Sequence, residues 1–550
     1  MPTMYPHWLR RPWRTQMGHA PRAAAQVLEH GGESLPFWPR LVDAAQRRAR
    51  HYAQFARPQS PDSSTERALD WLERHVAQYG SAATPGGAPC SGLAGAILAT
   101  ASRFGREALA ARLADWLMDI QLADGSLPDG NRQATSLWNT ALAAQGWLAH
   151  LPSDRRHTFA ARRACDFLAD HIDYHGRIHA PQSHASLERW AGAAMHLAYL
   201  PALVAAAEHW QAPEYMQAAR SLLSAHQRQA RVAWGAPLRM LAAQAEGALA
   251  CGDEQLARDL LRLPTASQRP TGAVPDRLGS REVSLAGLAR LATLWLRLGE
   301  TDRAHRAIGW ISRHQQVDGG LIARRAPGWR RAEPASAWAV TCYLDAVHAQ
   351  VETCFECVTP DLPQAIDPAD GRLRAVAALL ATLPAGSRVA DVGCGSGRYL
   401  HWLARWFPNL RFTGIDPSHR LLASLPKEVE ARAGGLLRIP AEAGEFDAVF
   451  SVEAVEHALD ARRAVAELVR VTRPGGRIIV IDKNRAFRAL SHHQPWERWF
   501  DRAEPAQWLA AGCDQVHCIE VAHGASCQPS GLFLAWLAQR CDAVAVRRAA

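Results

Sequence analysis

The segment from residue 389 to residue 397, with the sequence VADVGCGSG, constrains the fold of this chain more than any other. It has the pattern of an apolar strand that runs into a glycine-rich turn, and residues 398–406 continue as a helix. Glycines let the backbone approach a ligand closely where the strands of a parallel sheet end. Strand-like and helix-like segments alternate from residue 371 onward, which predicts an α/β, doubly wound, Rossmann-like parallel sheet.

Further segments extend this pattern along the chain. Residues 411–417 (RFTGIDP) form a predicted strand that ends in Asp416, where a carboxylate can accept both hydroxyls of a ribose. Residues 446–457 (FDAVFSVEAVEH) predict a buried strand with polar residues at its carboxyl end. Residues 470–482 (RVTRPGGRIIVID) predict a Pro-Gly-Gly turn and another strand, and residues 531–536 (GLFLAW) predict the last strand.

This order of motifs resembles class I S-adenosylmethionine-dependent methyltransferases over residues 371–541. The resemblance implies S-adenosylmethionine as the cofactor and methyl transfer as the reaction. It also implies the cofactor-binding residues: Asp391, Gly393, Gly395 and Gly397 around the methionine part, Asp416 and Pro417 at the ribose, Leu436 at the adenine, and Ser451, Val452 and Glu453 along the methyl-transfer cleft.

The sequence departs from this family at the adenine. Relatives often carry an acidic residue that binds the adenine amine shortly before a Leu-Pro-Phe-like segment. Here Gly435 stands where the acid is expected, ahead of residues 439–441 (IPA). We therefore expect backbone groups or Leu436 to hold the adenine. A degenerate domain without activity is the alternative.

Methyl transfer is a direct displacement, so the protein mainly supplies alignment, but a hydroxyl acceptor also needs a base. His457, next to Glu456, is the first candidate for that base, and its alternative role is to cap the following helix. Histidine, glutamate and tryptophan side chains form a second candidate cluster, in which the tryptophans serve either packing or the stacking of a sugar ring: His492, His493, Trp496, Glu497 and Trp499. No metal site is predicted, and the spacing of Cys354 and Cys357 is interpreted as incidental.

Residues 64–350 have helical periodicity nearly throughout, and one phrase recurs in them. Residues 116–127 (WLMDIQLADGSL) match residues 310–321 (WISRHQQVDGGL), and residues 167–178 hold a degenerate copy. Each copy predicts a helix, an Asp-Gly or His-Gly turn, and a second helix. The architecture resembles the α/α toroids of terpenoid cyclases, protein prenyltransferase β subunits, six-hairpin glycosidases and polysaccharide lyases. An open α-solenoid is the alternative.

The chemistry of this helical domain is less constrained. It lacks the Asp-x-Asp-Asp acid of protonating terpenoid cyclases and the Cys-His-Gly zinc motif of lanthionine cyclases. Cleavage of a glycan would need paired carboxylates, for which the available residues are Asp124, Asp129, Glu188, Asp276 and Asp318, with Asp124 and Asp318 already explained as turn residues. We expect the helical domain to hold the methyl acceptor: a glycan, a lipid-linked glycan or a small molecule, with a role in polysaccharide biosynthesis. The alternative is a toroid-centred glycan-processing enzyme or scaffold with an accessory methyltransferase domain.

The predicted organisation is therefore multidomain: an extension over residues 1–63, the toroid over 64–350, a proline-containing linker over 351–370, and the methyltransferase domain over 371–550. The formal net charge of +9 comes from scattered arginines rather than a basic stripe, so no nucleic-acid partner is expected. The amino terminus lacks the apolar core of a secretory signal, no transmembrane segment is expected, and the cysteine spacing predicts reduced thiols in a cytoplasm. The acceptor atom and the oligomeric state do not follow from the sequence.

Overall fold

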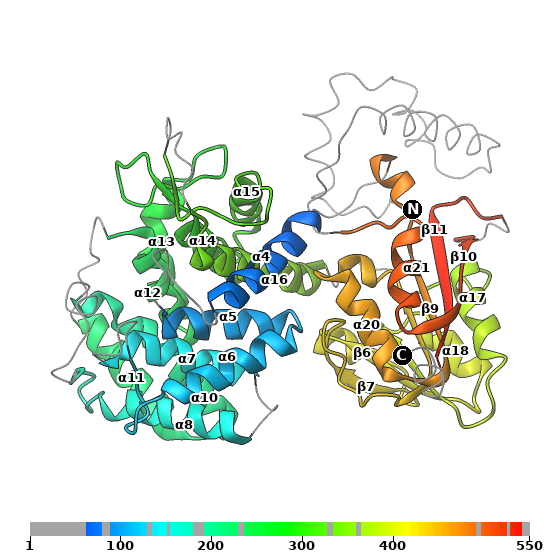
Figure 1. Ribbon diagram of the computed structural model, residues 1–550, viewed down its shortest axis with the longest axis horizontal. Coiled ribbons are helices and arrows are strands. Elements are labelled where there is room, and N and C mark those ends of the chain that lie inside the picture. The colour runs from blue at the N-terminus through cyan, green and yellow to red at the C-terminus, as the bar shows by residue number, and fades with distance from the viewer. Residues whose placement is uncertain are drawn as a thin grey trace, which may run out of the picture.

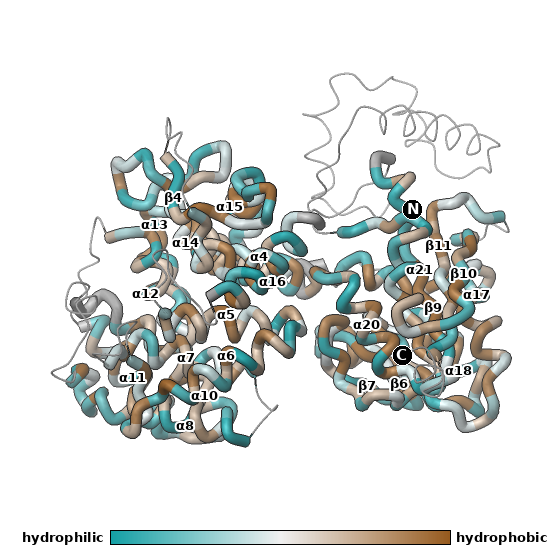
Figure 2. The backbone as a smooth tube through the Cα atoms, in the orientation of Figure 1, coloured by the Kyte–Doolittle hydropathy of each residue, from teal (hydrophilic) through white to brown (hydrophobic). Residues whose placement is uncertain are grey.

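The computed structural model describes residues 62–79, 89–128, 135–150, 155–179, 192–228, 236–326, 334–358, 365–490, 497–524 and 528–541. Nearly all of the predicted extension over residues 1–63 thus lies outside the described residues. The described chain forms a helical part, residues 62–358, beside a sheet part, residues 365–541 (Figure 1). Hydrophobic segments run through the interior of both parts (Figure 2).

The sheet part confirms the predicted alternation of strands and helices. Its seven strands lie in the order β10-β11-β9-β8-β5-β6-β7. Their bounds are β5 (Arg388–Val392), β6 (Arg411–Asp416), β7 (Glu430–Ala433), β8 (Phe446–Val452), β9 (Thr472–Lys483), β10 (Cys513–Val521) and β11 (Phe533–Arg540). The sheet is mixed rather than wholly parallel, because β11 runs antiparallel to both of its neighbours.

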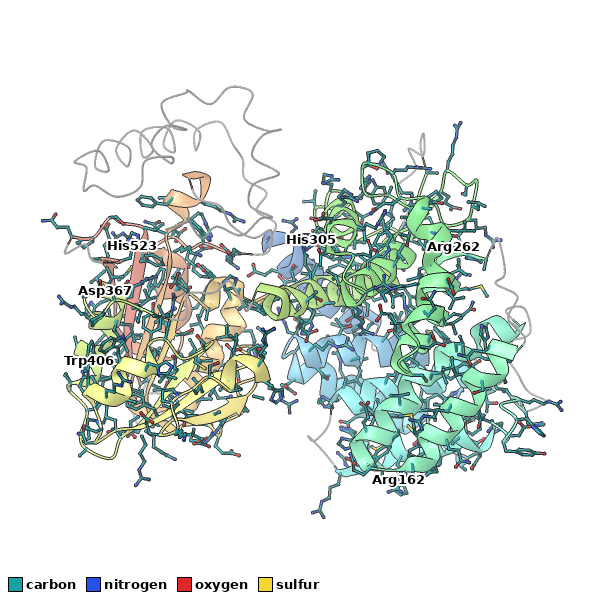
Figure 3. The ribbon with its side chains drawn as sticks, turned by 180° about the vertical axis from the view of Figure 1, so that it is seen from behind. Arg162, Arg262, His305, Asp367, Trp406 and His523 are labelled. Carbon is teal, nitrogen blue, oxygen red and sulfur yellow. The ribbon has the colours of Figure 1, made fainter. Side chains whose placement is uncertain are left out.

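Helices cover both faces of this sheet, and the strand sequences explain why. In β8 the side chains of Ala448 and Phe450 enter one core and that of Val449 enters the other, as the two-residue period of a strand requires. The first core is shared with α17 (Gly371–Leu380) and α18 (Leu400–Trp406). The second is shared with α20 (Ala461–Val471) and α21 (Ala503–Ala510), which lie between the sheet and the helical part (Figure 1). Figure 3 shows the opposite flank, marked by Asp367, Trp406 and His523.

The helical part consists of helices that alternate between two layers. One layer, which we call the outer layer, contains α4 (Asp62–Tyr79), α6 (Glu107–Ile120), α8 (Arg155–Asp170), α11 (Pro213–Arg228), α13 (Glu254–Ala266) and α15 (Thr301–Ser312). The other, the inner layer, contains α5 (Ser91–Arg103), α7 (Leu137–His150), η2 (Gly192–Tyr199) with α10 (Leu200–Trp210), α12 (Leu238–Ala250), α14 (Leu285–Arg297) and α16 (Ala337–Val358). In this second layer each helix packs on the next, and α16 packs back on α5. Two short antiparallel strand pairs accompany the helices: β1 (Leu127–Pro128) with β2 (Thr135–Ser136), and β3 (Val283–Ser284) with β4 (Arg324–Arg325).

The sequence repeat has the same structural role in three copies. A glutamine after an outer helix donates its side-chain amide to the carbonyl of a turn glycine and to a carbonyl of the next outer helix. The three sets are Gln121 with Gly125 and Ala160, Gln268 with Gly272 and Arg303, and Gln315 with Gly319 and Ser64. The copy at Gln268 is not evident from the sequence phrase. Because Ser64 belongs to α4, the last repeat is bonded to the first helix.

The end of α16 differs from the predicted linker. The helix continues to Val358, so the segment with Cys354 and Cys357 is helical and the first eight residues of the interval 351–370 extend α16. The linker prolines begin only at Pro360, and nothing before that position stops a helix. Within the parts of the chain that the structure describes, no helix is long and apolar enough to cross a membrane.

Candidate functional site

The glycine-rich turn after β5 has the backbone that the sequence predicts. Gly393, Gly395 and Gly397 have φ angles of 80°, 55° and 77°, in the left-handed region that favours glycine. A β-carbon on Gly393 would lie 2.3 Å from the Ala454 β-carbon, and one on Gly397 would lie 2.3 Å from Leu425 Cδ2. A β-carbon on Gly395 would have nothing within 4 Å. Two of the glycines therefore serve close packing, and the third faces open space.

Two carboxylates lie beside this turn. Asp416, at the end of β6, accepts hydrogen bonds from the Gly395 and Ser418 backbone N–H groups, each at 2.9 Å. Asp391 is buried, and its Oδ2 has no hydrogen-bond partner in the protein. Burial, together with the charge of Asp416, raises the pKa of Asp391 well above its ordinary value. An unpartnered buried oxygen next to an open turn is suited to a donor group on a ligand.

The segment expected to hold the adenine has no carboxylate at its predicted position. A β-carbon on Gly435 would meet nothing within 4 Å, and Leu436 packs against the core that includes Ile415 and Ile439. Glu467, on α20, instead accepts a hydrogen bond from the Ile439 backbone N–H at 2.9 Å. The Glu467 carboxylate therefore anchors the loop around Ile439 to α20.

The residues at the end of β8 divide between packing and ion pairing. Ser451 is fully buried and donates to the Val392 carbonyl at 2.8 Å, which joins β8 to β5. Val452 packs in the core. Glu453 has a φ of 54° and forms ion pairs with Arg372, at 2.6 Å, and with Arg398. Although burial opposes ionisation, the two guanidinium groups hold the pKa of Glu453 below its ordinary value.

The next residues form a buried charged cluster with the end of β9. Lys483 Nζ lies 2.6 Å from Glu456 Oε1 and 3.6 Å from Glu497 Oε2. His457 Nε2 lies 3.5 Å from the same Glu456 oxygen, and Trp499 Nε1 donates to Glu497 at 3.0 Å. The two clusters predicted from the sequence are thus joined in part. His492, His493 and Trp496 lie outside the described residues.

Burial shifts the pKa values of this cluster in opposite directions. It raises the pKa of Glu456 to about 8, with Lys483 opposing the shift and Glu497 adding to it. It lowers the pKa of His457 to about 4. His457 is not a helix cap, because Asp460 accepts the Arg463 N–H at the start of α20. That alternative role for the histidine is therefore wrong.

The comparisons with known proteins bear on this site. Residues 390–480 match the family model of the methyltransferase domain. The sheet part contains a class I S-adenosylmethionine-dependent methyltransferase domain. The chain is 31% identical over 146 residues to a demethylmenaquinone methyltransferase of Roseiflexus castenholzii, covering 26% of this chain and 61% of that protein. It is 35% identical over 155 residues to the chloroplastic tocopherol O-methyltransferase of Arabidopsis thaliana, covering 26% of this chain and 44% of that protein.

Among solved structures, an S-adenosylmethionine-dependent methyltransferase from Aquifex aeolicus is 20% identical, with 34% of this chain and 98% of that chain covered and a TM-score of 0.28. The chain spans less than two thirds of the length of the two curated relatives named above.

S-adenosylmethionine is the methyl donor of this domain class, and the residues around the glycine turn fit it. The unpartnered Asp391 oxygen and the open side of Gly395 are available to a ligand, and Asp416 lies next to them. Their placement agrees with the roles that the resemblance implies. Those roles stay predictions, as does the role of Pro417, which follows Asp416 directly.

The helical part contacts the methyltransferase domain at the segment that contains Glu456 and His457. Phe355, near the end of α16, packs edge-to-face on His457 with ring centroids 5.0 Å apart. Arg106 bonds Asp460 at 2.7 Å and Glu73 of α4 at 3.2 Å. Residues 455–460 are therefore held from the helical side near both ends.

Arg498 makes a further connection across this junction. Its backbone N–H donates to the Glu456 carbonyl at 2.7 Å, while its guanidinium pairs with Glu66 of α4 and with Glu504 of α21. Arg106, Arg498 and Lys483 could not be identified from the sequence, because each has a partner that is distant along the chain: Asp460, Glu66 and Glu456. The sequence shows that these residues are basic, but it does not show which acidic residues they pair with.

Proposed function

We propose that this chain transfers a methyl group from S-adenosylmethionine to an acceptor bound where the methyltransferase domain meets the helical part. The observation that carries the proposal is the position of residues 454–460. Ala454 packs against Gly393 of the cofactor turn, and three residues later His457 contacts Phe355 of the helical part. One short segment thus adjoins both the cofactor turn and the helical part.

The charged cluster supplies a path for the acceptor proton. Methyl transfer breaks the sulfur–methyl bond as the acceptor oxygen forms its bond to the methyl carbon, and the hydroxyl proton must leave. His457 is neutral near pH 7 because its pKa is lowered, and it is the more accessible member of the pair. We infer that His457 takes the proton and releases it to solvent, because Glu456, whose pKa is raised to about 8, already holds a proton near pH 7.

For the helical part we propose a closed α/α toroid that holds the acceptor. The return of α16 to α5 and the bonds from Gln315 to α4 support a closed ring over an open solenoid. Three carboxylates on the helices of the inner layer are paired with basic side chains: Glu246 with Arg290, Asp345 with Arg103, and Glu352 with His348. Paired carboxylates favour binding over glycoside cleavage, which needs a carboxylic acid and a carboxylate free to act.

Of the other acids considered for cleavage, two have structural explanations and two lie outside the described residues. Asp124 and Asp318 accept backbone N–H groups within their own turns, as predicted. Asp276 is buried beside β3, and Asp129 and Glu188 are not among the described positions. This distribution favours the methyltransferase proposal over a glycan-processing toroid.

We propose a small hydroxyl-bearing molecule as the acceptor. The tryptophans that motivate a glycan or lipid-linked glycan are partly accounted for by packing, since Trp147, Trp295 and Trp310 are buried in the helical core. One named relative is a tocopherol O-methyltransferase, which favours a hydroxyl group as the acceptor. A glycan acceptor is the second class to test.

The test begins with calorimetric titration of S-adenosylmethionine into the full chain, its Asp416→Ala variant, and a Glu520→Gln control at an exposed ion pair. Binding that only the Asp416 variant loses supports the cofactor site. Radiolabelled methyl transfer is then measured with prenylated hydroquinones and with polar glycans as separate acceptor pools. The absence of cofactor binding at millimolar concentration would refute the proposal.

A further inference from the structure

The cluster at the junction gathers three buried carboxylates around a lysine. Glu456, Glu497 and Asp482 are all at most 6% exposed. Lys483 bonds Glu456 and approaches Glu497. Glu453, close by, is paired with Arg372 and Arg398. Burying a carboxylate is costly unless a proton or a cation balances its charge.

Several potential ligand atoms of this cluster have no hydrogen-bond partner among the residues that the structure describes. They are Glu456 Oε2, His457 Nδ1 and both carboxylate oxygens of Asp482. Glu456 and Asp482 are fully buried. Orphaned polar atoms of this kind, on three residues of one cluster, indicate a ligand that the protein itself does not provide.

The geometry suits a metal ion. Glu456, His457 and Glu497 each offer one ligand atom, and the three atoms lie within 4.8 Å of one another. Across the described parts of the chain, this is the group of three or more potential ligands that meets that distance. Two carboxylates and one imidazole form a mixed oxygen and nitrogen set, and three protein ligands leave coordination positions open.

We propose that Glu456, His457 and Glu497 form a binding site for a divalent cation of the Mn²⁺ type, in which Lys483 takes the place of the ion when the ion is absent. The lysine side chain is 21% exposed, so its ammonium group has access to solvent when an ion enters. A divalent ion supplies more positive charge to these buried carboxylates than the ammonium group that it replaces. Asp482 contributes to the negative charge around the site.

The cation site deepens the proposed function and, in its catalytic consequence, rests on it. A divalent ion next to the methyl-transfer cleft would bind the acceptor oxygen and lower the pKa of its hydroxyl group. The proton then leaves more readily, and the acceptor is aligned by the ion as well as by the helical part. In this state His457 holds the ion together with Glu456 and does not take the proton.

The experiment is an electron paramagnetic resonance titration of Mn²⁺, in which free Mn²⁺ is measured against increasing full-length protein. We expect one ion bound per chain, with affinity reduced about tenfold or more in Glu497→Gln and in His457→Ala. Lys483→Met removes the competing ammonium group and should increase the affinity. The exposed Glu520→Gln variant is the matched control and should bind Mn²⁺ like the original chain.

Two results would overturn the cation site: no loss of free Mn²⁺ at millimolar protein, or binding that is unchanged in Glu497→Gln and Lys483→Met. The increase in Mn²⁺ affinity expected for Lys483→Met controls for misfolding, since a misfolded protein would not bind Mn²⁺ more tightly. S-adenosylmethionine is titrated into the same samples. Cofactor binding without Mn²⁺ binding rejects the cation site alone, whereas Mn²⁺ binding without cofactor binding rejects the proposed function alone.

Discussion

Alanine substitutions at Gly393 and Gly395 should separate the stability of the glycine turn from its binding function. Both glycines have positive φ angles, which cost a residue with a β-carbon about 1–2 kcal/mol. At Gly393 the new β-carbon would also lie 2.3 Å from that of Ala454, and overpacking of this kind costs a further 1–3 kcal/mol, roughly. Gly393→Ala should therefore cost about 2–5 kcal/mol of unfolding free energy, and Gly395→Ala only about 1–2 kcal/mol.

Cofactor binding should be weakened more by Gly395→Ala than by Gly393→Ala. The Gly395 β-carbon would enter the open space next to Asp416, so it should weaken S-adenosylmethionine binding by about tenfold or more, which is roughly 1.4 kcal/mol. Urea unfolding and calorimetric titration of both variants measure the two quantities. A Gly395→Ala protein that binds the cofactor like the original chain would refute the assignment of this turn to the cofactor.

Three further predictions concern the junction and the ring. Arg106→Ala removes the bond to the buried Asp460 and should lower kcat several-fold while leaving the dissociation constant of the cofactor unchanged, which steady-state kinetics and calorimetry distinguish. Because the folded-state pKa of Glu456 is raised to about 8, the folded protein holds this proton more tightly, and stability should fall as pH rises from 6.5 to 8. The unfolding free energy should fall by about 2 kcal/mol over this pH range. In Glu456→Gln, urea unfolding should show a smaller dependence of this free energy on pH, and an unchanged dependence would contradict the raised pKa of Glu456. Gly319→Ala places a β-carbon 1.9 Å from the Arg67 carbonyl oxygen and should destabilise the helical part, whereas Gly299→Ala meets nothing within 4 Å and should cost only about 1 kcal/mol in thermal unfolding.

Strands and turns that are determined by residues adjacent in the sequence could be predicted from residue patterns. The apolar run before Gly393 and the strand that ends in Asp416 fold as predicted, because strand period and turn chemistry are read within one segment. The Pro-Gly-Gly segment, predicted as a turn before a strand, lies instead within β9, where the register with β8 shifts. The strands β7 and β10 have many exposed polar positions and gave no such signal.

The partners of the charged residues could not be predicted from the sequence. Glu456 meets Lys483 because the sheet order places β9 next to β8, and Glu453 meets Arg372 because α17 packs on β8. Such pairs depend on topology rather than on local pattern. The capping role of Asp460, by contrast, could have been predicted, since an aspartate directly before an amphipathic helix is a strong N-cap signal.

The bond between the last repeat and the first helix has a consequence for how this protein can be divided. α4 and α16 come from opposite ends of the helical part, and Figure 1 shows both at the junction with the methyltransferase domain. α4 contributes Glu66, which pairs with Arg498, and α16 contributes Phe355, which contacts His457. In the proposed toroid, removing α4 would thus open the ring and at the same time remove the Glu66 contact with Arg498. A helical part shortened by α4 would therefore lose two contacts at once: the bond that joins the last repeat to α4, and the ion pair of α4 with the methyltransferase domain.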